Sequence, residues 1–254
     1  MDRKHAQILV LVLTVITVSS VRAEYSVAPD DALKNIVAKA RQNEELAEEI
    51  GFHQITVVKK MKNGKVTSEN IRMHRSVWLE NEPFMELIKV DGQDLSPKEK
   101  KQEAERKAKF LKSLREKKEE EESVTWDDLY SKYDFQLLPA DSIGHYVFSF
   151  QPKSGKLPER SKSEKVLNHV KGTLWADDEF NIVRAEAKLL DDVRFGLGIL
   201  GKLENLELKF EQQDFQNIRV PASLYIHFKA RVALLKMEER QIQATYKDFF
   251  RRQK

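Results

Sequence analysis

The spacing of hydrophobic residues changes within the first hundred positions of the chain. Residues 29–50 place their apolar side chains close to one helical stripe, with Pro29 and an acidic pair at the start and a glycine after the end, which predicts an amphipathic helix. From position 53 to 90 apolar and polar residues alternate, and Asn63-Gly64 lies between the first two runs as a hairpin signal. The chain is therefore expected to begin as a helix followed by an antiparallel meander.

A segment of different composition follows at residues 97–122. Of its 26 residues 18 are charged, and its few apolar residues form a narrow helical stripe. Ser96, with Pro97 next to it and Glu99 three positions on, resembles a capping box, so a charged helical insertion is expected here. Two interpretations stay open: an arm that binds a partner protein or lipid headgroups, and a solvated helix that rests one thin edge on the body.

After a short helix expected at residues 126–133 and capped by Thr125, the pattern is almost entirely that of strands. Alternating runs follow at residues 146–150, 170–175, 180–189, 205–211, 224–232 and 242–246, with a Lys/Ser/Pro-rich loop at 151–163. About eight or nine antiparallel strands result, each with one apolar face. Such a face must be covered, because each buried side chain contributes roughly 1.5–3 kcal/mol. The predicted fold is α+β: a strongly curved antiparallel sheet, or half-barrel, with helices covering its concave face.

The apolar positions of these strands define a candidate ligand-binding set. Its members are Phe148, Phe150, Ala185, Ala187, Leu206, Leu208, Ile226 and Phe228. Small neighbouring residues such as Ala185 and Ala187 would leave room for a hydrophobic cavity. The alternative interpretation is that all of these residues belong to an ordinary packed core.

The first 23 residues have the three parts of a signal peptide. A basic start precedes an apolar run at residues 8–18, and a short polar stretch ends at Ala23, where cleavage would leave residues 24–254 as a single domain. The run is short against the roughly 20 residues of a bilayer-spanning helix, and no second run of its length follows. No transmembrane segment is therefore expected after cleavage, and a retained N-terminal anchor is the alternative.

Cysteine and charge content narrow the setting further. The chain has no cysteine, so it offers neither the attachment point of a bacterial lipoprotein anchor nor the disulfides of many exported eukaryotic domains. The expected location is the bacterial periplasm. Without residues 1–23 the chain has 41 basic and 40 acidic residues, interleaved along its length. Nucleic-acid binding proteins usually carry a one-signed basic face, so no nucleic-acid partner is expected.

Motifs of catalysis are absent from the sequence. There is no glycine-rich phosphate loop, His-Glu-x-x-His pair, Gly-x-Ser-x-Gly elbow or cysteine nucleophile, so the chain is not expected to be an enzyme, and no cofactor or metal site is predicted. The acidic runs at 177–179 and 191–192 are either calcium ligands or turn residues, and their position between strands favours turns. A hydrolase whose catalytic groups meet only in the folded chain is a further alternative.

Residues 195–201 form the most unusual stretch, an apolar run that contains three of the nine glycines. A nucleotide-binding loop is not expected, because a strand rather than a helix pattern follows. Two interpretations stay open: a flexible lip that closes on an apolar ligand, and a buried strand with bulges.

The hairpin at residues 170–186 carries a family resemblance. Gly172, Trp175 and Asp177 fit a strand of the pattern Gly-x-hydrophobic-Trp-x-Asp, and Arg184 and Glu186 fit a following strand of the pattern hydrophobic-x-Arg-hydrophobic-Glu. In these features the chain resembles the superfamily of outer-membrane lipoprotein-sorting proteins with the LolA/LolB-like fold. The resemblance implies a half-barrel closed by helices around a cavity that accepts the acyl chains of lipoproteins or other lipids. The charged insertion and the missing lipid-attachment cysteine distinguish this chain from the carrier and receptor types of that superfamily.

The expected function is that of a periplasmic, non-catalytic carrier that binds a lipid or a lipidated protein in a hydrophobic cavity, with an envelope protein as a further partner. The alternative is an envelope protein-interaction or sensor module with the same fold and a filled core, which would work through the charged helix. Lipid bound after purification would distinguish the first function from the second.

Overall fold

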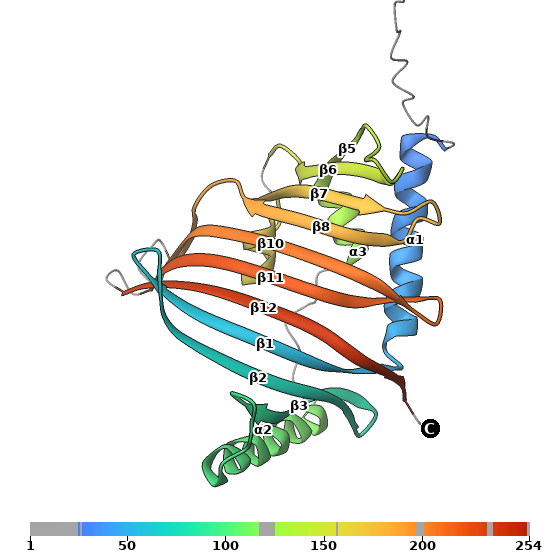
Figure 1. Cartoon of the computed structure of the whole chain (residues 1–254). Helices are drawn as coiled ribbons and strands as arrows, with labels where there is room; N and C mark the ends of the chain where they lie inside the picture. The colour runs from blue at the N-terminus through green and yellow to red at the C-terminus, as the bar shows by residue number, and fades with distance from the viewer. Residues whose placement is uncertain are drawn as a thin grey trace, which may run out of the picture.

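The chain forms one open antiparallel sheet with helices packed against it (Figure 1). The computed structural model describes residues 25, 27–116, 125–155, 157–196, 201–232 and 236–252. The strands are β1 (Ile50–Lys62), β2 (Lys65–Leu79), β3 (Glu82–Val90), β4 (Gln93–Asp94), β5 (Tyr133–Leu138), β6 (Tyr146–Pro152), β7 (Val170–Ala176), β8 (Ile182–Leu189), β9 (Val193–Phe195), β10 (Gly201–Phe215), β11 (Ile218–Val232) and β12 (Lys236–Arg251). The helices are α1 (Pro29–Ala47), α2 (Pro97–Arg115), α3 (Trp126–Lys132) and α4 (Lys162–Leu167). The expected signal peptide and residues 117–122 of the charged insertion lie outside the described residues.

The sheet joins the two halves of the chain through its first and last strands. Its order is β4-β3-β2-β1-β12-β11-β10-β8-β7-β6-β5, and β9 pairs with the start of β10. Pairing of β1 with β12 places Val57 opposite Gln243, so the N-terminal meander extends the C-terminal strands. The expectation of about eight or nine strands was too low, since the described part of the chain contributes twelve strands to the sheet. β5, β9 and the two-residue β4 account for the difference, and the last two are too short to give a clear alternating pattern.

Tight turns join the long strands of the meander. Asn63 and Gly64, the predicted hairpin signal, both have positive φ, at 51° and 73°, as a two-residue hairpin turn requires. Asp91 and Gly92 repeat this conformation, at 48° and 78°, between β3 and β4. The hairpin predicted at Asn63-Gly64 is thereby confirmed.

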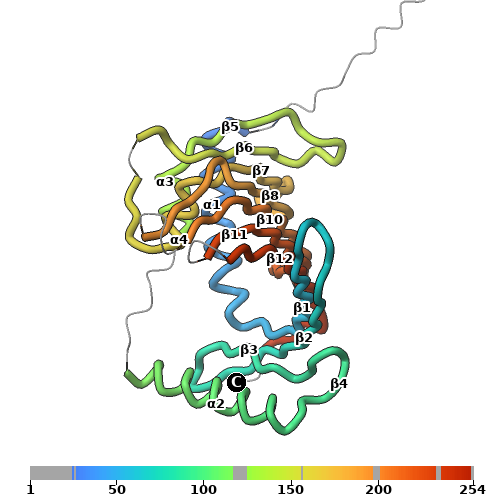
Figure 2. Tube along the Cα trace, turned by 90° about the vertical axis from the view of Figure 1, so that its left-hand side faces the viewer, coloured from blue at the N-terminus to red at the C-terminus, as the bar shows by residue number. Residues whose placement is uncertain are grey.

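Three helices lie on one face of the sheet: α1, α3 and α4 are on the same side of it in Figure 2. Helix α1 buries Ala32, Leu33, Ile36 and Ala40 on the apolar stripe predicted for residues 29–50. They pack against Tyr146, Phe148, Leu174, Ala176 and Ile182 of β6, β7 and β8. The helix ends at Ala47, earlier than expected, because Ile50 already begins β1.

Helix α2 lies elsewhere, along the edge formed by β3 (Figure 2). Its predicted capping box of Ser96 and Glu99 is present. Glu103 accepts a hydrogen bond from the backbone N–H of Leu87 at 3.0 Å, and the Arg106 guanidinium donates one to the carbonyl of Met85. No residue of α2 is buried. These contacts agree with a solvated helix that rests one edge on the body, while the role of a partner-binding arm stays untested.

Two elements of the middle of the chain differ from the prediction. The loop expected at 151–163 includes the end of β6 and the start of α4. Helix α4 is six residues long and is fixed by the Ser161 cap rather than by an apolar stripe, which explains why periodicity did not reveal it. The helix predicted at 126–133 is confirmed as α3, with a capping box of Thr125 and Asp128. None of the helices in the described ranges is long and apolar enough to cross a membrane.

Candidate ligand-binding cavity

A row of small residues between larger ones forms a hollow in the helix-bearing face of the sheet. The strand register places Phe150 opposite Gly172, Gly172 opposite Ala187, and Ala187 opposite Leu208. Directly paired residues of antiparallel strands project from the same face. The ring of Phe150 occupies the space over Gly172, so the floor has little side-chain volume at Ala187, with Phe150 and Leu208 on either side.

Helices complete this hollow into an apolar cavity of about 250 Å³. Its lining comes from α1, α3, α4 and five strands of the sheet. The lining residues are Leu33, Ile36, Val37, Trp126, Leu129, Tyr130, Tyr133, Phe135, Phe150, Val166, Leu167, Val170, Leu174, Ala185, Ala187, Leu206 and Leu208. Every one of them is hydrophobic or aromatic, so the cavity suits an apolar ligand and offers no charge to bind a polar one.

A phenol fixes the wall between β5 and α4. The Tyr133 hydroxyl donates a hydrogen bond to the Leu167 carbonyl at 2.5 Å, which ties the last turn of α4 to the first residue of β5. Burial raises the pKa of Tyr133 to about 12, so this hydroxyl stays protonated throughout the physiological range. The hydrogen bond can therefore hold this wall in place at any pH at which the protein works.

An ion-pair network anchors α3 and α4 behind the cavity. The Glu164 carboxylate is 2% exposed, and it accepts hydrogen bonds from the Lys132 ammonium and, at 2.9 Å, from Nε of Arg160. Arg160 also binds Asp128 at 2.8 Å, the residue that completes the cap of α3. Hydrogen bonds lower the pKa of Glu164 to about 2, and those from Arg160 have the largest effect, followed by the one from Lys132. Ion pairs thus help to fix two short helices that also contribute apolar side chains to the cavity.

The structure brings together five of the eight residues predicted for the ligand site. Phe150, Ala185, Ala187, Leu206 and Leu208 all line the cavity. The other three do not. Phe148 is buried in the core beneath α1, and Ile226 and Phe228 of β11 lie opposite Leu208 and Leu206, on the same face but beyond the cavity wall.

Sequence reasoning missed the residues that the helices contribute to the site. Leu33 and Ile36 were recognisable as the apolar stripe of a helix, and Trp126 and Leu129 follow a helix cap, but periodicity does not say which part of a sheet a helix covers. Val166 and Leu167 lie in the unpredicted α4. The helical half of the cavity thus became visible only with the tertiary structure.

The acidic runs serve as turns and ion-pair partners. Asp177 accepts hydrogen bonds from the backbone N–H groups of Glu179 and Asn181 and pairs with Arg219, as the turn interpretation predicted. Asp191 pairs with a histidine and Asp192 with a lysine. Within the described ranges, no group of three or more His, Asp or Glu side chains could hold a metal ion.

The glycine-rich stretch is described only at its ends. Phe195 closes β9 and pairs with Gly201, the first residue of β10, and Gly196 has a positive φ of 56°. Residues 197–200 lie outside the described part of the chain, so both interpretations of this stretch stay predictions.

The chain is similar to several solved structures at low identity, while no protein-family model and no curated protein sequence matches it. A DUF1329 family protein from Desulfovibrio piger is 12% identical, with 87% of this chain and 93% of that chain covered and a TM-score of 0.33. An outer membrane lipoprotein-sorting protein domain from Vibrio parahaemolyticus is 11% identical, with coverage of 87% and 93% and a TM-score of 0.37. A LolA superfamily protein from Nitrosomonas europaea is 14% identical, with coverage of 85% and 94% and a TM-score of 0.30. The matched structures thus include members of the superfamily that the sequence resembles.

Proposed function

We propose that this protein is a non-catalytic periplasmic carrier that holds the acyl chain of a lipid or lipidated protein between its sheet and helices. The observation that carries the proposal is the cavity, whose lining is hydrophobic or aromatic throughout. In this proposal the sheet works as a half-barrel, with α1, α3 and α4 over its concave face. Export by residues 1–23 and a periplasmic location belong to the same proposal.

The volume of the cavity suits one narrow ligand. At about 250 Å³ it lies just below the range of roughly 300–1,000 Å³ that is typical of small-molecule pockets. An acyl chain is slender, and each methylene it buries contributes about 0.8 kcal/mol. A single chain can therefore bind tightly enough to be shielded from water and weakly enough to be released.

The floor of the cavity supports a binding role over a filled core. Two residues of the floor, Ala185 and Ala187 of β8, have small side chains, although the same strand carries Ile182 where it packs beneath α1. Protein interiors are close-packed, and empty apolar space costs stability. Small residues that leave such space are therefore better explained by a ligand than by packing.

The test is the lipid content of the purified protein. The protein is recovered from an envelope fraction, its N-terminus is established, and bound lipids are extracted for mass spectrometry. Ala187→Phe places a ring in the cavity and is expected to remove the bound lipid. The matched control is Thr173→Phe, which adds a ring to the opposite face of the neighbouring strand β7.

Stoichiometric acyl lipid in the wild type and in Thr173→Phe, and none in Ala187→Phe, supports the carrier. A stable wild-type protein without lipid overturns it. The protein-interaction or sensor module then becomes the better hypothesis, and deletion of residues 97–122 is expected to abolish partner binding.

A further inference from the structure

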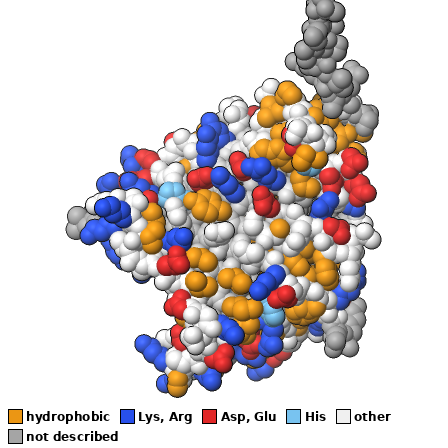
Figure 3. Space-filling model, viewed as in Figure 1, with side chains coloured by type: hydrophobic (Ala, Val, Ile, Leu, Met, Phe, Trp, Pro, Cys, Tyr) orange, Lys and Arg blue, Asp and Glu red, His pale blue; other side chains and the backbone are white. Residues whose placement is uncertain are grey.

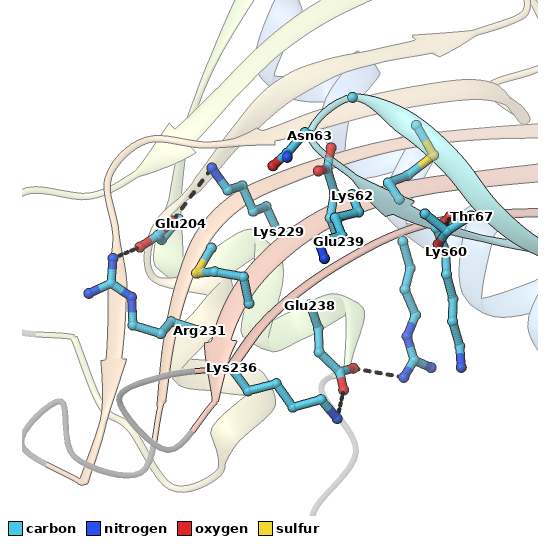
Figure 4. A pocket seen from close by; sticks show the side chains of 14 residues that line it. Lys60, Lys62, Asn63, Thr67, Glu204, Lys229, Arg231, Lys236, Glu238 and Glu239 are labelled. Carbon is cyan, nitrogen blue, oxygen red and sulfur yellow. Dashed lines mark hydrogen bonds and ion pairs between the residues drawn. The ribbon is translucent and has the colours of Figure 1, made fainter.

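A second hollow, unlike the first, lies at the end of the sheet where the β1–β2 hairpin meets the strands of the C-terminal half. It is a cleft of about 1100 Å³. Figure 4 shows Lys62 and Asn63 of the hairpin facing Lys229 of β11 and Glu239 of β12. The register places Met61, Glu239 and Lys229 beside one another on one face of the sheet, and Lys60 beside Arg240 on the other. The cleft therefore takes side chains from both faces at the end of these strands.

The cleft is strongly cationic. Six of its lining residues are basic and three are acidic: Lys60, Lys62, Lys229, Arg231, Lys236 and Arg240 against Glu204, Glu238 and Glu239. Glu204 pairs with Lys229, Arg231 and, outside the lining, Lys202, and Glu238 pairs with Lys236 and Arg240. Two carboxylates thus already serve five cations. The ammonium groups of Lys60 and Lys62 form no ion pair within the described part of the chain. This surplus of positive charge is suited to an anion from outside.

Exposed apolar side chains surround the same end of the sheet. Val66 is 51% exposed on the hairpin, Val232 is 42% exposed at the end of β11, and Met237 is 43% exposed at the start of β12. The register places Val66 opposite Met61 and Met237 opposite Arg231, both of which line the cleft. Elsewhere on the face of the sheet seen in Figure 3, hydrophobic side chains are interspersed with charged ones of both signs.

We propose that this end of the sheet docks on an anionic lipid surface, with the cleft taking phosphate-bearing headgroups. Lys and Arg near an anionic bilayer are attracted to it, and exposed aliphatic side chains gain by entering its interface. An acidic protein would satisfy the cations alone, whereas a lipid surface satisfies the cations and the three exposed aliphatic residues together.

This docking surface is separate from the apolar cavity, with which it shares no lining residue. If the docking surface fails its test, the carrier proposal is therefore unaffected. If the carrier proposal fails, the docking surface is likewise unaffected. The variant Ala187→Phe, which is designed to empty the cavity, is expected to bind membranes as the wild type does.

The test is co-sedimentation of the protein, as recovered from cells, with vesicles. Wild-type protein is expected to bind vesicles of phosphatidylglycerol and phosphatidylcholine in equal parts, and to bind pure phosphatidylcholine weakly. Binding should also weaken as salt is raised, because exposed charges are screened. The variant Lys60→Glu/Lys62→Glu removes the two unpaired cations and is expected to weaken binding about tenfold or more.

The matched control is Lys98→Glu/Lys101→Glu, which makes the same change of net charge on the exposed, cationic face of α2. Loss of binding in the hairpin variant with little change in the control supports the cleft. An equal loss in both variants overturns it, since net charge alone would then explain the binding. Binding of free pyrophosphate or of polyglutamate, without binding of the anionic vesicles, also overturns it and identifies a soluble phosphate or an acidic protein as the partner.

Discussion

At the scale of single residues, the cavity depends on a glycine that allows two strands and a ring to meet. A Cβ atom built on Gly172 would lie 2.0 Å from the carbonyl oxygen of Glu186 and 2.5 Å from the ring of Phe150. Phe150 therefore lies across a position with no side chain, as aromatic residues often do beside a strand glycine. This contact fixes one border of the cavity floor.

Replacement of this glycine is expected to be costly. Gly172→Ala would force the β7 and β8 backbones apart and displace Phe150, which should lower the free energy of unfolding by about 1–3 kcal/mol. Thermal unfolding followed by circular dichroism measures the effect. The double variant Gly172→Ala/Phe150→Leu should not recover the loss, since the clash with the Glu186 backbone persists. Wild-type stability in Gly172→Ala would contradict the close approach.

The Glu164 network gives the protein a specific response to acid. The carboxyl has an ordinary pKa of 4.5, and in the folded protein its hydrogen bonds to Arg160 and Lys132 lower the pKa to about 2. A lowered carboxyl pKa stabilises the folded state above the ordinary pKa, and this contribution is lost as the pH falls through the folded value. The contribution of Glu164 should therefore decline between about pH 4.5 and pH 2.

Glu164→Gln tests this contribution. The variant leaves Lys132 buried without its carboxylate and is expected to lose about 3 kcal/mol of stability at neutral pH. Denaturant unfolding at pH 6 and at pH 3 measures both effects. Stability should fall less between the two pH values in the variant than in the wild type, because other carboxyls with lowered pKa contribute equally to both. An unchanged pH dependence would show that this network is not coupled to folding.

At the scale of elements, α2 covers part of the outer edge of β3, and we expect this to limit self-association of the sheet. The edge of β3 is covered by the short β4 only at its end, and an uncovered edge is a template for pairing with a second chain. Glu103 accepts a hydrogen bond from the backbone N–H of Leu87, and Arg106 donates one to the carbonyl of Met85. The rings of Phe110 and Phe84 also pack together, with their centroids 5.1 Å apart. The charge-rich composition of α2 thus has a structural use in addition to solubility.

The variant Glu103→Ala/Arg106→Ala should expose this edge. We expect a concentration-dependent shift toward dimers or larger species, measured by analytical ultracentrifugation, because the freed N–H and C=O groups can pair across copies. The control Glu105→Ala/Lys109→Ala removes one charge of each sign from exposed positions of the same helix. If both variants stay monomeric, α2 does not protect the edge.

How well each element could be predicted depends on how local its cause is. The Asn63-Gly64 turn and the Ser96 and Thr125 caps are fixed by a few neighbouring residues, and all three were predicted. The apolar faces of β8 and β10 were equally clear from their alternation. Helix α4 was not, although Ser161 caps it, because the helix is only six residues long and its Glu164 pairs with Lys132, 32 residues away. The match of α3 and α4 to the floor at Ala187 likewise depends on tertiary packing.

At the scale of the whole molecule, two hollows of opposite character share one sheet. The apolar cavity lies under the helices between β5 and β10, and the cationic cleft lies at the end of β10, β11 and β12 beside the β1–β2 hairpin. The inner-face residues Ile226 and Phe228 of β11 lie between the two sites, opposite Leu208 and Leu206. A continuous sheet thus offers a place for an acyl chain and, separately, a place for a charged surface.

A ligand that binds only the folded protein must stabilise it, which allows the two sites to be separated in one experiment. A neutral monoacylglycerol has an acyl chain and no charge, so it should bind the cavity and ignore the cleft. At a concentration of about 100 times its Kd it should add about 2.7 kcal/mol of stability. For a protein of this size that corresponds to a rise in Tm of roughly 5–10 °C.

The rise in Tm should persist in Lys60→Glu/Lys62→Glu, whose substitutions lie outside the cavity, and in the control Thr173→Phe. It should vanish in Ala187→Phe, which should itself melt no lower than the delipidated wild type, because the ring fills space that is empty without a ligand. A shift that survives Ala187→Phe would place the acyl chain elsewhere on the molecule. A shift lost in the hairpin variant would mean that the cleft and the cavity are parts of one binding site rather than two.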